Sequence, residues 1–365
     1  MKAVVLAGGY ATRLRPISYA LPKLLFPVLG KPMIYWALDM LEGMGIEKVV
    51  LAVNYLADPL RSEVGSNYKG INIEYSLEKS PLGTGGPIKL ASEATRLDET
   101  FIAMNGDVIA NIDLEKMLKQ HAKTKASITD ALHEVRNPAR FGSAEIDREA
   151  RIRRFVEKPR SKDAHSRLIN AGVYMIEPEI LSMIPAKRKV SLEREIFPRL
   201  ARDGKLFGFP FSGDWFDIGN LSDYQRANFS LLKKQAKAAV SHKGNVHVAN
   251  GAIIKSPVII GEDSRVEGGA FLGPNVVAGK NELIKARARV SNSILFDGVT
   301  VGEESVVSGA ILAFGVVVGR GVRIESGSII SPHVQIRDGV KIGRKVIVHP
   351  HKEIESNIKS ETHVM

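Results

Sequence analysis

The stretch MKAVVLAGGYATRLRPISYALPKLLFPVLG (residues 1–30) decides the fold of the first half of the chain. A short apolar run from Ala3 to Ala7 ends in Gly8-Gly9, and the cations Arg13 and Lys23 follow. A buried strand that runs into a glycine turn brings backbone N–H groups close to a ligand, and nearby cations suit phosphate oxygens. This order predicts a nucleoside triphosphate site at the carboxyl end of a parallel strand, where open α/β sheets bind ligands.

The loop GGYATR (residues 8–13) differs from both common phosphate loops, since it follows neither GxxxxGK[ST] nor GxGxxG. Gly8-Gly9 alone is also compatible with an ordinary tight β–α turn. The cations Arg13 and Lys23 are close to that turn in the sequence, and they favour the phosphate site.

Composition places the chain among globular proteins. Its 365 residues suffice for about two or three domains, and 44% apolar with 25% charged residues is ordinary. No apolar stretch approaches the ~20 residues of a membrane helix, and the N-terminal apolar run is too short for a signal peptide. We therefore expect a cytoplasmic protein with no membrane partner.

Charge and cysteine content narrow the chemistry. The chain has no cysteine, which excludes disulfides, thiolate metal sites and cysteine nucleophiles. The formal net charge of +11 is scattered, and the densest basic run, Arg151–Arg154 with Lys158 and Arg160, is short. This pattern fits anionic small substrates better than nucleic acid.

The first ~230 residues alternate strand-like and helical patterns, which predicts a doubly wound α/β sheet within a domain of residues 1–235. The predicted parallel strands are KAVVLAG (2–8), KVVLAVN (48–54), INIEYSL (71–77) and TFIAMNGD (100–107), and PMIYWALDMLEGMG (32–45) is amphipathic. The β-rich segments after about residue 126 look like a second sheet layer or an insertion that covers the site. A helix over residues 221–239 closes the domain.

From about Ser241 onward, apolar residues recur every six positions and the helical pattern ends. The recurring residues form three runs: Val248, Ile254, Ile260, Val266 and Leu272; Leu295, Val301 and Val307; Val318, Ile324, Ile330, Ile336, Ile342 and Val348. A hexapeptide repeat builds a parallel β-helix, here residues 241–365, and we expect small insertions at corners where the register shifts. The flat faces and open ends of such a domain predict a homo-oligomer.

Two aspartates stand out as metal ligands. Asp107 follows an apolar strand in Asn105-Gly106-Asp107, a suitable place to hold a Mg²⁺ that also binds triphosphate oxygens. Asp217, within WFDIG (215–219), is a candidate second ligand. The alternatives are a turn or cap role for Asp107 and a capping role for Asp217 at the helix that starts near Ser222.

Two further motifs suit a sugar phosphate. Glu157-Lys158-Pro159 offers an acceptor for hydroxyls and a cation for phosphate, with a solvated turn as the alternative. Asn170-Ala171-Gly172 offers a side-chain amide beside a glycine. No serine–histidine–acid set is convincing, so direct displacement between bound phosphates, which needs positioning and charge neutralisation, fits best.

Together these residues resemble those of the sugar-1-phosphate nucleotidyltransferases (NDP-sugar pyrophosphorylases), and most of all the mannose-1-phosphate guanylyltransferases. The family's LAGGxGTRLxP loop and PKxxxPV segment stand here as LAGGYATRLRPISYALPKLLFPV (residues 6–28). Its GD, EKP, NAG and W-x-D-x-G motifs match Asp107, Glu157–Pro159, Asn170–Gly172 and Trp215–Gly219. A C-terminal left-handed β-helix is also typical of several branches.

The resemblance implies the reaction NTP + sugar 1-phosphate → NDP-sugar + pyrophosphate, with Mg²⁺ held by Asp107 and Asp217. It implies that Arg13 neutralises the triphosphate, and that Lys23 and Lys158 hold the attacking phosphate or the α-phosphate. The implied catalytic residues are Arg13, Lys23 and Asp107. The implied substrate-binding residues are Leu6, Ala7, Gly8, Gly9, Glu78, Gly83, Gly142, Glu157, Lys158, Asn170 and Gly172. One departure is Ala11, which stands where the family usually has glycine, so the loop must avoid a positive φ there or bear strain.

The identities of the nucleotide and of the sugar are inferred by analogy with the family. The segments PLGTGGP (81–87) and SLEREIFP (191–198) are similar to the mannose-1-phosphate guanylyltransferase branch, and Glu78 is a candidate acceptor for guanine or an exposed loop residue. GTP with mannose 1-phosphate is therefore the favoured pair. The alternatives are a glucose-1-phosphate thymidylyl- or uridylyltransferase, and a non-catalytic regulatory subunit that binds a partner protein.

Overall fold

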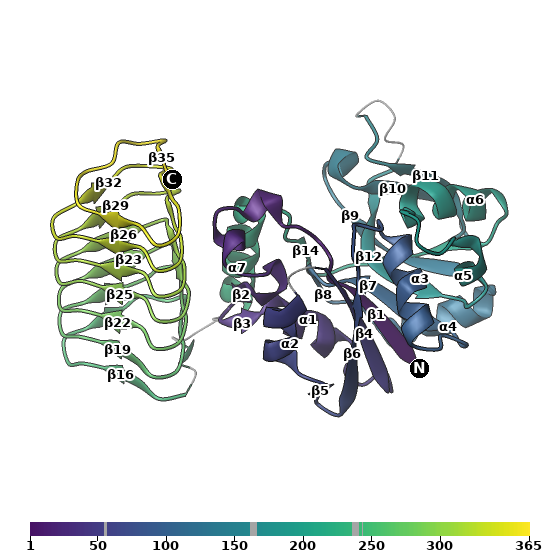
Figure 1. Cartoon of the computed structure of the whole chain (residues 1–365), viewed down its shortest axis with the longest axis horizontal. Coiled ribbons are helices and arrows are strands. Elements are labelled where there is room, and N and C mark those ends of the chain that lie inside the picture. Colours follow the sequence, from purple (N-terminus) through teal and green to yellow (C-terminus); the bar gives the residue numbers. More distant parts are fainter. Residues whose placement is uncertain (55–56, 161–165, 236–240, 243) are drawn as a thin grey trace. The chain divides into compact units, whose positions relative to one another are not determined.

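The computed structural model describes residues 1–54, 57–160, 166–235, 241–242 and 244–365 (Figure 1). The chain forms two compact units, which are described separately. The first consists of Met1–Tyr10 and Met33–Asp217, and the second of Ala11–Pro32 and Ile218–Met365. The predicted domain division at residues 235–241 stays a prediction.

The first unit is built on one large sheet. Its strand order is β11-β10-β12-β7-β1-β4-β6-β5, and β9 pairs with β12 and β13. The four predicted parallel strands are confirmed as β1 (Lys2–Leu6), β4 (Lys48–Val53), β6 (Ile71–Leu77) and β7 (Phe101–Asn105). Strand β1 lies between β4 and β7 and pairs in parallel with both, so the glycine turn follows a central strand.

The segments after residue 126 extend this same sheet, so the expected second layer or covering insertion is wrong. Strand β12 pairs antiparallel with β7, with Val173 opposite Met104. Both strands are buried along most of their length, which suits a position inside a sheet covered on both faces. The added strands are β9 (Ile128–Glu134), β10 (Gly142–Ile146), β11 (Ile152–Glu157), β12 (Leu168–Ile176) and β13 (Leu206–Phe211), and β5 (Asn67–Tyr68) closes the other edge.

Helices pack on the sheet, as expected for a doubly wound fold. They are α1 (Met33–Met40), α2 (Ala57–Val64), α3 (Gly85–Ala94), α4 (Leu114–Thr124), α5 (Ile180–Met183) and α6 (Phe197–Arg202), with a π-helix at Leu192–Ile196. Figure 1 shows α3 alongside β1 and β4, and its Ile88 and Ala91 share a core cluster with Val4 and Val50. The α6 residue Phe197 belongs to the same cluster.

A two-stranded ribbon completes the first unit. Strand β8 (Val108–Ala110) follows β7 after a short turn and pairs antiparallel with β14 (Trp215–Asp217). The ribbon therefore joins the end of β7 to a segment more than a hundred residues later in the chain.

The second unit begins with 3₁₀ helices at Thr12–Leu14, Ile17–Tyr19 and Lys23–Leu25, followed by β2 (Pro27–Val28) and β3 (Lys31–Pro32). Helix α7 (Leu221–Gln235) packs on this segment. The Asn228 side chain accepts the Leu29 N–H over 2.9 Å, and the Phe26 and Tyr224 rings meet edge to face. Helix α7 confirms the predicted closing helix as far as Gln235, and residues 236–239 of that prediction lie outside the described residues.

The C-terminal part is a parallel β-helix of three sheets, as the hexapeptide repeat predicts. The first sheet contains β15 (Ser241–His242), β18 (Val258–Ile260), β21 (Val276–Ala278), β24 (Ser293–Leu295), β27 (Ile311–Leu312), β30 (Ile329–Ile330), β33 (Ile347–Val348) and β35 (His363–Val364). The second contains β16 (Val246–Val248), β19 (Ser264–Val266), β22 (Leu283–Ile284), β25 (Thr300–Val301), β28 (Val317–Val318), β31 (Gln335–Ile336) and β34 (Glu353–Ile354). The third contains β17 (Ile253–Ile254), β20 (Phe271–Leu272), β23 (Arg289–Ser291), β26 (Val306–Ser308), β29 (Arg323–Ile324) and β32 (Lys341–Ile342).

The recurring aliphatic residues form the β-helix core, but the expected corner insertions are wrong. Ile259 is paired with Val277 and Val277 with Ile294, so the second of these coils is one residue shorter than the first. The core residues Val290 and Leu295 flank the shortened step. A corner loses one residue more easily than a strand because the strands must keep their alternation of inward and outward side chains.

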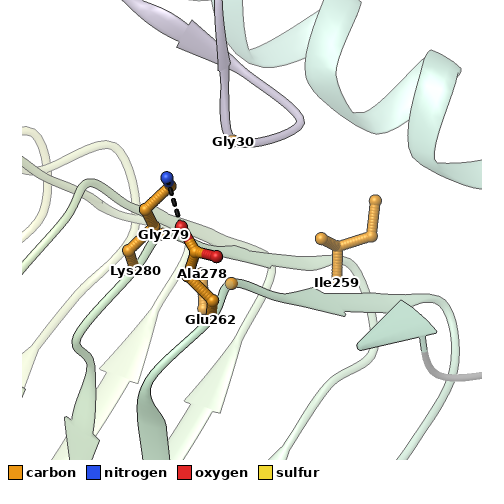
Figure 2. A pocket seen from close by; sticks show the side chains of 7 residues that line it. Gly30, Ile259, Glu262, Ala278, Gly279 and Lys280 are labelled. Atoms are coloured by element: carbon orange, nitrogen blue, oxygen red, sulfur yellow. Dashed lines mark ion pairs between the residues drawn. The ribbon is translucent and has the colours of Figure 1, made fainter. Parts of the chain in front are cut away.

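Ion pairs link successive coils at the surface. Figure 2 shows Glu262 and Lys280 pointing toward each other beside a cavity of about 190 Å³. Both side chains are about half exposed, so this pair adds little stability. Among the described residues, no helix combines the length and apolar character that crossing a membrane requires.

Candidate active site

At least one position of the glycine turn after β1 has no room for a side chain. A methyl group on Gly8 would overlap the Oε1 atom of Glu78, whereas a methyl group on Gly9 would meet nothing within 4 Å. The Asn54 amide donates to the Gly8 carbonyl over 2.6 Å, and the Ala7 N–H donates to the Ala52 carbonyl over 2.8 Å. Gly8 therefore permits a close internal contact, and Gly9 leaves open space for a ligand.

Glu78 is buried, so the alternative of an exposed loop residue is wrong, and its role toward guanine stays a prediction. Its side chain is 7% exposed, and its Oε2 accepts the Leu82 N–H over 3.0 Å. Burial raises the pKa of the Glu78 carboxyl, and the Leu82 N–H opposes that shift. Glu78 thus joins the glycine turn to the loop of residues 80–87.

Gly83 lies where that loop crosses a distant segment. Its φ is +80°, and a methyl group there would overlap the Val190 carbonyl. Gly83 also forms a parallel bridge with Val190. The two segments that resemble the guanylyltransferase branch, residues 81–87 and 191–198, are therefore brought together in space.

The two candidate metal ligands lie at neighbouring positions. Gly106 donates its N–H to the Leu6 carbonyl over 3.0 Å, which places Asp107 beside the end of β1. In the β8–β14 ribbon, Asp217 is opposite Val108, the residue after Asp107. Strand pairing therefore brings the two carboxylate-bearing residues to one end of the ribbon.

The capping alternative for Asp217 is wrong. Asn220 performs that task, since its Oδ1 accepts the Asp223 N–H of α7 over 2.9 Å. Within the described part of the chain, no group of three or more histidine or acidic side chains is arranged to hold a metal. A pair of carboxylates fits Mg²⁺, which usually keeps several waters and takes its other ligands from substrate phosphates.

Glu157 and Lys158 lie at the end of β11. Glu157 pairs with Gly142, and a methyl group on Gly142 would overlap Phe155 and come within 2.9 Å of Glu157 Oε2. Burial, and secondly the Glu193 carboxylate, raise the pKa of Glu157, while Lys158 at 3.7 Å opposes the shift. Lys158 is 60% exposed at a φ of +50°, so the turn directs a cation into solvent beside a half-buried acid.

Asn170 and Gly172 form an irregular step in β12. The Asn170 amide donates to the Tyr174 hydroxyl over 2.9 Å, and its Oδ1 accepts the Gly172 N–H over 2.7 Å. Gly172 has a φ of +78°, and a methyl group there would lie 2.5 Å from Asn105 Nδ2. Gly172 is therefore packed against the residue two positions before Asp107.

An aromatic cluster supports this step, and sequence reasoning gave it no role. The Trp215 indole N–H donates to the Ala171 carbonyl over 3.0 Å. The His133 ring stacks on Trp215 with centroids 5.6 Å apart, and Phe141 meets Trp215 edge to face. Burial lowers the pKa of His133. The sequence signal was the position of Trp215 in the same motif as Asp217.

Arg13 and Lys23 belong to the second unit. The Arg13 guanidinium lies beside Gly219, where an added methyl group would be 3.4 Å from Nη2. Lys23 begins a 3₁₀ helix after Pro22. Ala11 has φ 49° and ψ 31°, so of the two expectations for this residue the loop bears strain rather than avoiding a positive φ. The Ser18 hydroxyl donates to the Ala11 carbonyl over 2.9 Å. The roles of Arg13 and Lys23 stay predictions.

Comparisons with known proteins agree with this architecture. The nucleotidyl transferase family matches residues 2–234, and the GMPPB C-terminal domain matches residues 244–364. The chain is 33% identical over 333 residues to the probable mannose-1-phosphate guanylyltransferase 1 of Oryza sativa subsp. japonica, with 89% of each chain covered. It is 36% identical over 304 residues to the mannose-1-phosphate guanylyltransferase of Mycobacterium tuberculosis, covering 82% of this chain and 80% of the relative.

A solved structure supports the same fold. HddC from Yersinia pseudotuberculosis, complexed with GMP-PN, aligns with a TM-score of 0.53 and 29% identity over 63% of this chain and 99% of HddC. The chain belongs to the nucleotidyl transferase family, in the branch that the mannose-1-phosphate guanylyltransferases represent. The expected enzyme class, sugar-1-phosphate nucleotidyltransferase, is thereby confirmed.

Proposed function

We propose that the protein joins GTP and mannose 1-phosphate to give GDP-mannose and pyrophosphate. The observation that carries the proposal is the series of contacts from Gly8 through Glu78 to the loop of residues 80–87. This series joins the glycine turn to the loop that resembles the guanylyltransferase branch. The names of the relatives and the guanine nucleotide analogue bound to HddC point to the same substrates.

The donor nucleotide contacts the first-unit residues around Gly8 and Gly9. Guanine presents an N1–H and an exocyclic amine, so it needs an acceptor, and the Glu78 carboxyl is one. Glu78 already accepts one N–H bond from Leu82, which fixes its orientation before the base arrives. The backbone N–H groups of Gly8 and Gly9 bind phosphate oxygens, as glycine turns do, and Leu6 and Ala7 contact the nucleotide.

The acceptor sugar lies against the residues at the end of β11 and at the irregular step in β12. Glu157 accepts hydrogen bonds from sugar hydroxyls. Because the Glu157 carboxyl is partly buried, hydrogen bonds from these hydroxyls compensate it for lost contact with water. Gly142, Asn170 and Gly172 shape the same floor. A phosphate oxygen of mannose 1-phosphate attacks the α-phosphorus in line, the new P–O bond forms, and the bond to the pyrophosphate leaving group breaks.

Charge neutralisation completes the proposal. Asp107 and Asp217 are the residues that would hold Mg²⁺, which supplies positive charge to phosphate oxygens when bound. Lys158 and Lys23 bind the attacking phosphate or the α-phosphate, and Arg13 neutralises the triphosphate and the leaving pyrophosphate. These roles rest on the resemblance, and the pairing of β8 with β14 supports them for Asp107 and Asp217 alone.

The test is pyrophosphate release by the full chain with Mg²⁺, across GTP, dTTP, UTP and ATP against the 1-phosphates of mannose, glucose and N-acetylglucosamine. The proposal predicts a dominant signal for GTP with mannose 1-phosphate. A dominant signal for dTTP or UTP with glucose 1-phosphate keeps the chemistry and overturns the specificity. Silence across the grid favours a regulatory subunit.

We further propose that the protein is a cytoplasmic homo-oligomer assembled through the β-helix. An outward apolar side chain supports the assembly, since Ile253 is 57% exposed. Analytical ultracentrifugation of the full chain and of an Ile253→Asp variant tests this. A monomer at micromolar concentration, for the parent chain, contradicts it.

A further inference from the structure

The loop of residues 80–87 is bonded to a segment more than a hundred residues later in the chain. Val190 donates its N–H to the Leu82 carbonyl, and Gly85 donates its N–H to the Val190 carbonyl, each over 2.9 Å. Leu192 donates its N–H to the Thr84 Oγ1 atom, also over 2.9 Å. The loop is therefore held in one place by the chain that leads into the π-helix.

Three side chains complete this connection, and we name Thr84, Ser191 and Glu193 the clasp. The Thr84 hydroxyl donates to Glu193 Oε2 over 2.6 Å, and the Ser191 hydroxyl donates to the same oxygen over 2.6 Å. Hydrogen bonds to an ionised carboxylate are shorter and about twice as strong as neutral ones. One carboxylate oxygen of Glu193 therefore bonds both to the loop, through Thr84, and to the later segment, through Ser191.

Thr84 occupies the N-cap position of helix α3, where a threonine hydroxyl ordinarily bonds to the backbone of the helix. It is the residue before helix α3, yet its side chain makes no capping bond to that helix. A capping threonine typically contributes about 1 kcal/mol. Here the hydroxyl bonds to Glu193 and Leu192 instead.

The other side of the clasp is a π-helix, a rare form that is frequently found at functional sites. Ser191 accepts the Arg194 N–H over 3.2 Å, and Glu195 accepts the Ser191 N–H over 3.0 Å. Within this π-helix, Glu193 accepts hydrogen bonds from Thr84 and Ser191.

The clasp stands between the donor and acceptor residues. On the donor side, Leu82 binds Glu78, and Glu78 lies against Gly8. On the acceptor side, the π-helix that contains Glu193 packs against β11, the strand that ends at Glu157, and the Glu193 carboxylate contributes to the raised pKa of Glu157. The clasp therefore lies between the loop that contacts the glycine turn through Glu78 and the strand that carries Glu157.

We propose that Thr84, Ser191 and Glu193 are positioning residues that hold the donor-nucleotide loop in register with the acceptor site. The inference rests on the proposed function. Holding reactants in a near-attack geometry contributes strongly to displacement chemistry, and a misplacement of about 1 Å costs roughly 100-fold. A loosened clasp weakens nucleotide binding and lowers kcat, while the overall fold persists.

The experiment compares Thr84→Val with Thr100→Val in the full chain. Thr100 is a matched control, because its hydroxyl donates to Glu177 Oε1 over the same 2.6 Å, just before the start of β7 at Phe101. Each variant loses one threonine-to-glutamate hydrogen bond, and Thr84→Val also removes the acceptor of the Leu192 N–H. Thr84→Ser keeps the clasp hydroxyl and serves as the conservative variant.

Steady-state kinetics with GTP and mannose 1-phosphate, GTP binding by titration, and thermal midpoints are measured for all three. We expect Thr84→Val to lower kcat/KM for GTP by about 10-fold or more and to weaken GTP binding. Thr84→Ser stays close to the parent, and Thr100→Val changes the thermal midpoint alone.

The outcomes separate the two proposals. Equal kinetics and equal GTP affinity for Thr84→Val and the parent overturn the clasp, as does a Thr84→Ser variant as impaired as Thr84→Val. A parent chain that binds GTP without turnover contradicts the proposed function, yet the GTP titrations still decide the clasp. A parent chain that neither binds nor converts GTP overturns both.

Discussion

At the scale of single residues, the proposed metal role of Asp107 is the most direct part of the account to test. Asp107→Asn keeps the size of the side chain in the turn between β7 and β8 and removes its charge. Because the variant loses half of the carboxylate pair, we expect kcat to fall by roughly 100-fold or more, with an unchanged thermal midpoint. Pyrophosphate release at a series of Mg²⁺ concentrations measures the effect.

The control for this prediction is Asp113→Asn. Asp113 caps helix α4 by accepting the Lys116 N–H over 3.0 Å, a bond that asparagine can also accept. That variant is expected to remain active. Full activity of Asp107→Asn would contradict the metal role of Asp107.

Ala11 carries a local strain that glycine would relieve. A left-handed conformation costs an alanine about 1–2 kcal/mol, whereas glycine adopts it freely. We therefore expect Ala11→Gly to stabilise the protein by up to about 1 kcal/mol, after the larger chain entropy of glycine is subtracted. Urea unfolding midpoints measure this.

Ala20 provides the comparison, because it is exposed and lies in the right-handed region with φ −99°. Ala20→Gly is expected to destabilise by about 0.5 kcal/mol, the ordinary sign for this substitution. Two shifts of the same sign would show that the strain at Ala11 is absent in solution.

The candidate residues themselves were accessible to sequence reasoning, but their contacts were not. Asp107 follows a strand and Asp217 lies in a short motif, so both are visible locally. Thr84 and Glu193 are far apart in the chain, and their hydrogen bond depends on how two loops cross. No local pattern encodes such a crossing, and the same applies to Gly172 against Asn105.

At the scale of elements, the irregular step in β12 determines where Asn105 lies. Gly172→Ala puts a methyl group 2.5 Å from Asn105 Nδ2 at a φ that alanine disfavours. We expect kcat to fall by about 10-fold or more, because Asn105 leads directly into Asp107. Kinetics and thermal midpoints are measured together.

Gly208 in β13 is a suitable control, since a methyl group there would overlap Leu132 in the apolar core. Gly208→Ala is expected to lower the thermal midpoint and to leave kcat close to the parent value. If both variants lose stability and neither loses kcat, the step in β12 has no catalytic role.

The β-helix offers a sharp test of its inward and outward positions within one strand. In β28, Val318 is 1% exposed and Val317 is 42% exposed. Val318→Asp buries a charge among aliphatic side chains, which costs several kcal/mol, whereas Val317→Asp is expected to cost less than about 0.5 kcal/mol. Circular dichroism melting separates them, and equal effects would contradict the coil register.

Element types followed from the sequence more readily than their partners. Apolar runs identified the four parallel strands, and the period of six identified the β-helix, because both patterns reflect burial directly. The apolar segments after residue 126 could not be assigned to the same sheet from the sequence, since an apolar run is compatible with either strand direction. The shortened corners between Val277 and Ile294 appear only once the strands are paired.

At the scale of the whole molecule, the two compact units do not follow the order of the chain. The segment Ala11–Pro32 groups with the β-helix, while the residues on either side of it belong to the first unit. Composition and repeats do not predict that residues 11–32 group with the β-helix, because tertiary packing alone determines this grouping. Arg13 and Lys23 therefore belong to a different unit from Asp107 and Glu157.

The central claim for the whole molecule is direct displacement of pyrophosphate by the sugar phosphate. GTP with a chiral α-phosphorus, the Sp isomer of its α-thio analogue, tests it most directly, with mannose 1-phosphate, Mg²⁺ and the full chain, and with the configuration of the sugar product as the readout. The account predicts inversion at the α-phosphorus, because a single in-line displacement inverts it. Retention, which two successive displacements through a nucleotidylated enzyme would give, would contradict it.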